Sequence, residues 1–121
     1  MPSSEPDILT ATVQDGPAGS SVVVAAGEID RDSRRHLRRA ADEALGNGRH
    51  RLVLDLSAVS YCDSSGLSLF VDLHREAKAA GGWLRLVGAQ PLLQHMLGAT
   101  NLDRILALYD SVEAATGNET C

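Results

Sequence analysis

Apolar runs with two different periods alternate along this chain, and their order limits the folds that it can adopt. Residues 9–13 alternate apolar and polar side chains, and residues 21–29 form a β-rich apolar run, so both ranges are predicted to be strands. The turn-forming residues 15–20 separate them and predict a hairpin. After this hairpin, helical segments alternate with short apolar runs. This pattern is typical of parallel strands joined through helical crossovers.

The remaining elements are predicted from the same two periods and from the residues that end them. Helices are expected at 33–45, 64–80, 91–97 and 111–115, and strands at 51–56, 83–87 and 105–109. Asp30 or Asp32 is expected to cap the first helix. The predicted fold class is therefore α/β: a mixed β-sheet of four to five strands, with an N-terminal hairpin and then βαβ units, covered by about four helices.

The composition fits one domain of ordinary size. The chain has 121 residues, of which 44% are hydrophobic and only 3% aromatic, so leucine, valine and alanine must build the core. We expect the domain to span residues 8–116, between a disordered N-terminus at 1–7 and a flexible C-terminus at 117–121. The net charge of −5 argues against direct binding of nucleic acid, which usually needs a basic surface.

Neither a secretion signal nor a membrane span is apparent in the sequence. The first residues lack the basic and apolar regions of a signal peptide, and the longest apolar run is too short to cross a bilayer. We therefore expect a cytoplasmic protein that does not contact a membrane. Cys62 and Cys121 form no disulfide or metal-binding framework, and the four histidines lack ligand spacing. We expect no metal and no cofactor.

The best candidate site is the segment YCDSSGL at residues 61–67, which follows a predicted strand and opens a predicted helix. Hydroxyl groups at a helix N-terminus lie near backbone N–H groups and the positive end of the helix dipole. Two interpretations stay open from the residues alone. Asp63 or Ser64 could simply cap the helix. Alternatively, Ser64 could accept a phosphate, whose charge this end of a helix tolerates.

Four short motifs, taken in order, resemble the STAS domain of anti-sigma factor antagonists. They are Gly27-Glu28-Ile29-Asp30, Leu54-Asp55-Leu56, Asp63-Ser64-Ser65-Gly66-Leu67 and Gly81-Gly82-Trp83-Leu84. The Asp-Ser-Ser-Gly-Leu motif is the specific one, and the Gly-Glu-Ile-Asp motif supports it. The resemblance extends over about residues 8–115, which is most of the chain.

The resemblance implies a phosphorylation switch. In this family an anti-sigma factor with serine kinase activity phosphorylates the first serine of the motif, here Ser64, and Ser65 is the less favoured acceptor. The unphosphorylated protein binds that anti-sigma factor and releases a sigma factor; phosphorylation switches binding off, and a serine phosphatase resets the switch. Asp30 and Asp63 match acidic positions of the family motifs. We expect them to contact the partner together with Ser64, Ser65 and Gly66.

Helical spacing divides the second predicted helix into two faces. The apolar residues of one face are Leu67, Phe70, Val71, His74 and Ala77. We expect this face to be buried, with His74 as a hydrogen-bonded structural histidine. Leu69 and Leu73 lie nearer the polar side and are candidates for partly exposed anchors that a partner contacts. A wide buried stripe would instead place both in the core.

The first predicted helix carries five arginines, at positions 31, 34, 35, 38 and 39. Their spacing of three and four residues places much of the set on one face. The ordinary interpretation is a solvated face that Asp42 and Glu43 partly balance. Cations at a helix start oppose the helix dipole, so the alternative is a surface that grips carboxylates of an acidic partner.

Enzyme motifs do not match this sequence. A serine hydrolase would need Gly where Asp63 stands, and a cysteine phosphatase loop would need Arg where Ser68 stands. The Gly-Lys pair of a phosphate-binding loop does not occur. We expect no enzymatic activity, so a partner kinase must supply the phosphate. The alternative function is a non-switching STAS scaffold of a signalling assembly, or a soluble accessory subunit of a membrane transport system.

Overall fold

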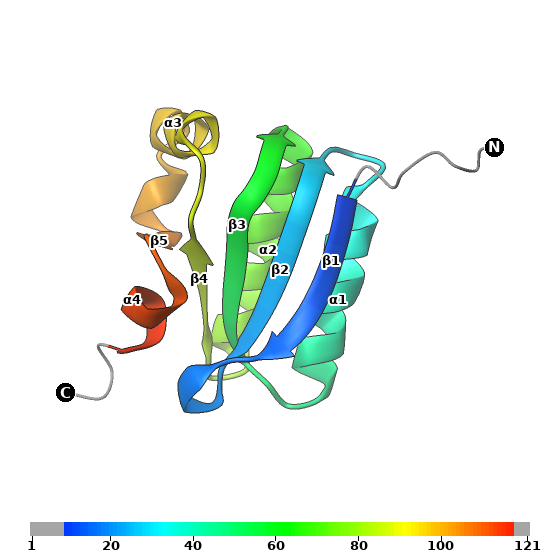
Figure 1. The fold of residues 1–121 in the computed structure, drawn as a ribbon, viewed down its shortest axis with the longest axis vertical. Helices are drawn as coiled ribbons and strands as arrows, with labels where there is room; N and C mark the ends of the chain where they lie inside the picture. The colour runs from blue at the N-terminus through cyan, green and yellow to red at the C-terminus, as the bar shows by residue number, and fades with distance from the viewer. Residues whose placement is uncertain (1–8, 118–121) are drawn as a thin grey trace.

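The computed structural model describes residues 9–117, in which five strands form one mixed sheet with helices against both faces (Figure 1). The strands are β1 (Leu9–Asp15), β2 (Ser21–Ile29), β3 (Arg51–Cys62), β4 (Trp83–Val87) and β5 (Ala107–Tyr109). The helices are α1 (Arg34–Gly46), α2 (Ser64–Ala79), α3 (Pro91–Ala99) and α4 (Val112–Gly117), with the 3-10 turns η2 (Pro17–Gly19) and η3 (Leu102–Arg104). The order of strands and helices and the α/β class confirm the sequence prediction.

The order of strands in the sheet is also their order in the chain. β1 and β2 pair antiparallel, as the predicted hairpin, and β2 to β5 are parallel. The carboxyl ends of the four parallel strands therefore lie along the same edge of the sheet. Binding sites of open α/β sheets usually lie outside that edge.

The stretches expected to be disordered or flexible, at 1–7 and 117–121, lie outside the described residues except for Gly117, which is the last residue of α4. Within residues 9–117, no helix combines the length and apolar character that crossing a membrane requires.

β3 is longer than predicted and projects past the end of β4. The prediction ended this strand at residue 56, but the strand continues to Cys62. Only residues 51–55 pair with β4, whereas the rest of β3 pairs with β2 through registers such as Gly27 with Val59 and Ile29 with Cys62. Two register shifts interrupt this pairing, between Val24 and Ala26 and between Gly27 and Glu28. The extension follows from partners on β2, which local sequence does not reveal.

The main core lies between the sheet and helices α1 and α2, which cover the same face of the sheet in Figure 1. Side chains of a strand alternate between the two faces. Leu52, Leu54 and Leu56 of β3 enter this core, while Val53 points to the opposite face. There a smaller cluster forms with Ala115 of α4. Leu93 and Leu97 of α3 close the main core beside the projecting half of β3.

The buried face of α2 differs from the predicted one. Leu69 and Leu73, which were candidates for exposed anchors, are only 4% and 1% exposed, so that expectation is wrong. Val71 and His74, expected in the buried face, are half-buried. The physical reason is that α2 packs against β3, β4 and α1 at once, so it buries a wide stripe centred on Phe70.

His74 does not have the hydrogen bond expected of a structural histidine. Its Nδ1 is buried and has no hydrogen-bond partner among the described residues. Desolvation lowers the pKa of the imidazole, and the neighbouring charges of Lys78 and Arg75 lower it further. Burial therefore favours the neutral form of the imidazole.

Phe70→Ala tests the packing of α2, since Phe70 is completely buried. Removing this ring should lower the free energy of unfolding by about 3–5 kcal/mol, through lost transfer energy and the cavity left behind. Leu92→Ala is the matched control because Leu92 is 55% exposed, and its effect should stay within about 0.5 kcal/mol. Urea denaturation followed by circular dichroism measures both. Similar values for the two variants would contradict this core assignment.

Candidate functional site

The candidate site lies where β2 and β3 end side by side. Ile29 and Cys62 are paired at these strand ends, and the backbone N–H of Asp63 donates to the Ile29 carbonyl at 3.1 Å. Asp30 and Asp63 each follow directly after their strand. The structure thus brings the predicted residues Asp30, Asp63, Ser64, Ser65 and Gly66 to the carboxyl edge of the sheet, whereas the buried Leu69 and Leu73 face the core.

Asp63 is the N-cap of α2, which confirms the capping interpretation for this residue. Its Oδ1 accepts hydrogen bonds from the backbone N–H of Ser65 at 2.9 Å and of Gly66 at 3.3 Å. The same oxygen accepts from the Ser65 hydroxyl at 2.5 Å. The Ser65 hydroxyl is the main cause that lowers the pKa of the Asp63 carboxyl, with further contributions from the N–H groups of Gly66, Ser65 and Arg31. These N–H groups are therefore already occupied by a carboxylate.

The two serines of the motif have different environments. Ser64 is the first residue of α2, it is exposed, and its hydroxyl makes no hydrogen bond to any described residue. Ser65 is half-buried, and its hydroxyl is held by the Asp63 carboxylate. A modifying enzyme would therefore reach the Ser64 oxygen without breaking a hydrogen bond, whereas Ser65 would first have to leave its cap.

Gly66 permits α2 to start close to the strand ends. A Cβ at this position would lie 2.5 Å from Cys62 Sγ and 2.7 Å from Ile29 Cγ2, both closer than van der Waals contact allows. Cys62 itself is buried, and desolvation, followed by the charge of Asp63, raises the pKa of its thiol to about 12. The thiol is therefore protonated at neutral pH and is a packing group rather than a nucleophile.

Asp30 shapes the turn between β2 and α1. Its Oδ1 accepts from the backbone N–H groups of Asp32 at 3.0 Å and Ser33 at 2.8 Å. The predicted capping of α1 by Asp30 or Asp32 is wrong in detail, since Ser33 occupies the cap position and its side chain makes no capping bond. The Ser33 hydroxyl instead donates to the Glu28 carbonyl at 2.8 Å. The physical reason is the intervening turn, which uses the Asp30 carboxylate before the helix begins.

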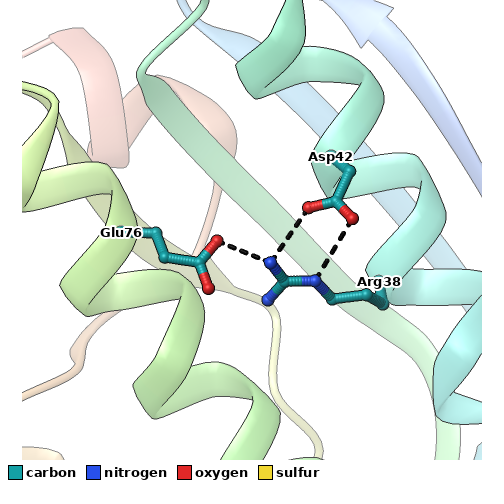
Figure 2. Close-up of polar contacts among 3 residues, drawn as sticks. All are labelled: Arg38, Asp42 and Glu76. Atoms are coloured by element: carbon teal, nitrogen blue, oxygen red, sulfur yellow. Dashed lines mark hydrogen bonds and ion pairs between the residues drawn. The ribbon is translucent and has the colours of Figure 1, made fainter.

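Two arginines of α1 reach across to α2. Arg34 Nη1 donates to the Ser65 carbonyl at 3.2 Å, next to the site. Farther along, Arg38 Nη2 lies 2.7 Å from Glu76 Oε1 and 3.1 Å from Asp42 Oδ1 (Figure 2). Exposed pairs of this kind contribute little to stability; the pair with Glu76 joins α1 to α2, and the pair with Asp42 lies within α1. The arginine face is therefore only partly solvated, and Asp42 is one of the balancing charges that the sequence predicted.

Sequence reasoning missed two exposed apolar residues near the site. Tyr61 precedes the motif on the projecting end of β3 and is 46% exposed, and Leu92 on α3 is 55% exposed. Both line a shallow crevice between β3 and α3. No local pattern in the sequence predicts this crevice, because it forms only where β3 extends past β4. Within residues 9–117, no group of three or more His, Cys, Asp or Glu residues is placed to hold a metal ion.

Gly66→Ala tests the close approach of α2 to the strands. The added methyl group should lower the free energy of unfolding by about 1–3 kcal/mol through overpacking, although alanine is otherwise the better helix former. Gly46→Ala is the control, since a Cβ there meets nothing within 4 Å. Adding Cys62→Ala to Gly66→Ala should relieve part of the overlap, so the double variant should lose less than the sum of the single losses. If the losses in free energy of unfolding, measured by urea denaturation, simply added up in the double variant, the proposed contact would be contradicted.

Asp63→Asn tests the charge of the cap. Because the folded state lowers the pKa of Asp63, the ionised carboxyl stabilises the fold above the unfolded pKa of about 3.9, and this contribution disappears as the pH falls through the folded pKa. At neutral pH the variant should be less stable by about 0.3–1 kcal/mol. The difference from the wild type should shrink below about pH 4. Urea denaturation across this pH range measures it, and a constant difference would show that charge is not responsible.

Comparison with known proteins agrees with this geometry. A family model described as "Mlab, STAS domain" matches residues 13–109. A Thermotoga maritima protein named as an anti-sigma factor antagonist is 35% identical over 74 residues, which are 61% of this chain and 66% of that protein, just under two thirds of its length. A Mycobacterium tuberculosis protein named as an anti-anti-sigma factor is 25% identical over 118 residues, covering 96% of this chain and 80% of that protein.

A solved structure is similar to this chain over nearly its whole length. The crystal structure of an anti-sigma factor antagonist from Mycobacterium paratuberculosis superposes with a TM-score of 0.84 at 29% identity, covering 96% of this chain and 97% of that one. The likeness therefore includes the hairpin, the parallel strands and the helix that starts at Ser64. Together with the family match over residues 13–109, it shows that this chain belongs to the STAS domain family.

Proposed function

We propose that this protein is an anti-sigma factor antagonist whose binding is switched off by phosphorylation of Ser64. The observation that carries the proposal is the contrast between the two serines. The Ser64 hydroxyl is exposed and unengaged at the first position of α2, while Asp63 holds Ser65. The relatives named as anti-sigma factor antagonists support the same function.

The surface around Ser64 suits contact with a protein. Exposed Tyr61 and Leu92 offer apolar area on one side, and Asp30 lies at the neighbouring strand end. Asp63, Ser65 and the glycine at 66 act by shaping the start of α2 rather than by offering free polar groups. Leu69 and Leu73 are left out of this surface because they are buried.

Phosphorylation would change this surface without unfolding it. A phosphate adds about −1.5 to −2 charges, which the N-terminal end of a helix tolerates. Since Asp63 already occupies the N–H groups of Ser65 and Gly66, the phosphate would remain largely uncompensated by these donors. Like charges brought together in an interface cost several kcal/mol. About 3 kcal/mol weakens binding roughly a hundredfold.

The proposed partners follow from this mechanism. An anti-sigma factor with serine kinase activity would bind the unphosphorylated protein and supply the phosphate from its own nucleotide, and a serine phosphatase would remove it. Release of a sigma factor is an intracellular event, so we place the protein in the cytoplasm, with no direct contact to nucleic acid or membrane. In this function the protein is a regulator and a kinase substrate, and it has no catalytic role of its own.

Ser64→Ala and Ser64→Asp test the switch. Affinity capture from lysate of the source cells, read by mass spectrometry, should recover an ATP-binding kinase with wild-type and Ser64→Ala baits. The Ser64→Asp bait should lose it, with affinity for the purified kinase reduced roughly a hundredfold. Ser65→Ala is the matched control. It should still be phosphorylated by that kinase, although loss of the bond to Asp63 should make it slightly less stable.

The opposite results would remove the switch. Equal recovery of the same partners by all three baits would show that charge at residue 64 does not control binding. Phosphate found on residue 65 instead would overturn the assignment of the acceptor. A stable high-order assembly, or a membrane transport complex recovered by every bait, would support the alternative function as a scaffold or accessory subunit.

A further inference from the structure

A groove between α2 and the first turns of α1, with the turn that precedes α1, concentrates positive charge beside the candidate site. It has a volume of about 480 Å³ and is lined by Arg31, Arg34, Arg35 and Arg38, with Leu69 and two aspartates. We call it the arginine groove. The chain as a whole carries a net charge of −5, so four guanidinium groups in one hollow differ sharply from its average surface.

The arginines of this groove are not all engaged within the protein. Arg38 pairs with Asp42 and Glu76, and Arg34 donates to the Ser65 carbonyl. Arg31 and Arg35 are exposed, and neither lies within 4.0 Å of a carboxylate in the described part of the chain. The groove therefore presents two guanidinium groups without a carboxylate partner, one from Arg31 in the turn before α1 and one from Arg35 in the first turn of α1.

The chemistry of the groove favours carboxylates over a nucleic acid. The guanidinium group binds a carboxylate with two parallel hydrogen bonds. Asp32 and Asp72 also line the groove, and a phosphate backbone passing through it would be repelled by both. Nucleic-acid sites instead have an extended basic surface. An acidic protein segment can place single carboxylates on the arginines and keep clear of the aspartates.

We propose that the arginine groove binds an Asp- or Glu-rich segment of a protein partner. The bond from Arg34 to the Ser65 carbonyl places the groove next to Ser64, so a partner docked over Ser64 would reach it. The identity of that partner rests on the proposed function, but binding of acidic residues to the groove does not. The phosphorylation switch and the arginine groove can therefore fail separately.

Titration with an acidic peptide, followed by NMR, tests the groove directly. A short capped peptide of alternating Asp and Glu is added to the ¹⁵N-labelled protein at low ionic strength. Saturable shifts are expected at the Nε–Hε signals of Arg31 and Arg35 and at the backbone signals of residues 69–72. The combined substitutions Arg31→Glu and Arg35→Glu should weaken binding at least about tenfold. Raising the ionic strength from about 0.01 M to about 1 M should abolish it, as the Debye length falls from ~30 Å to ~3 Å.

Matched controls separate the groove from general charge. Arg39→Glu with Arg104→Glu makes the same change in net charge at exposed arginines that do not line the groove, and it should change the affinity less than about twofold. The milder pair Arg31→Gln and Arg35→Gln should also weaken binding, and spectra of every variant report whether the fold is intact. Ser64→Ala should bind the peptide as the wild type does, which keeps this test independent of the switch.

Three results would overturn the proposal. The first is the absence of saturable shifts in the groove, or shifts confined to another surface. The second is equal weakening by the groove pair and the control pair. The third is tighter binding in the groove of a single-stranded oligonucleotide with the same number of charges, which would assign the groove to nucleic acid instead.

Discussion

One carboxylate oxygen of Asp63 accepts hydrogen bonds from the backbone N–H groups of Ser65 and Gly66 and from the Ser65 hydroxyl. The backbone N–H of Asp63 donates to the last residue of β2, so the cap also ties α2 to the sheet. This single residue therefore sets the direction of α2, uses the donors that would otherwise attract an anion, and immobilises one of the two serines. Ser64 is left exposed as a consequence of how its neighbours are satisfied.

The length of β3 is the second constraint on the site. β3 pairs with β2 as far as Cys62, while β4 ends opposite Asp55. The second half of β3, residues 56–62, therefore projects past the end of β4. This projection exposes Tyr61 and makes room for α3 beside it. A β3 that ended at residue 56 would place Asp63 and Ser64 in a loop above the sheet, without the partner strand that fixes them. The geometry of the candidate site thus depends on long-range pairing as much as on the local motif.

The parts of the structure that the sequence predicted are those governed by local chemistry. The strand and helix order follows from hydrophobic period, and the start of α2 follows from an Asp-Ser-Ser-Gly sequence after a strand. Apart from the local turn that displaced the cap of α1, the failures involve contacts between distant segments. Leu69 and Leu73 are buried because α1 and the sheet enclose α2 on more than one side, which a helical period alone does not encode. The end of β3 was missed for the same reason.

The arrangement also explains how a modification could alter binding while the fold persists. Phe70 and Leu73 of α2 are buried, whereas Ser64 is exposed at the start of the same helix, so charge added at Ser64 stays at the surface. The donors nearest to Ser64 are already used, so the added charge gains no new internal partner from the cap that would reorganise the helix start. The added charge then acts mainly on a partner that contacts this surface. In the proposed function, the site would act on its partner through electrostatics, which requires a rigid start of α2 more than it requires any reactive group in the protein itself.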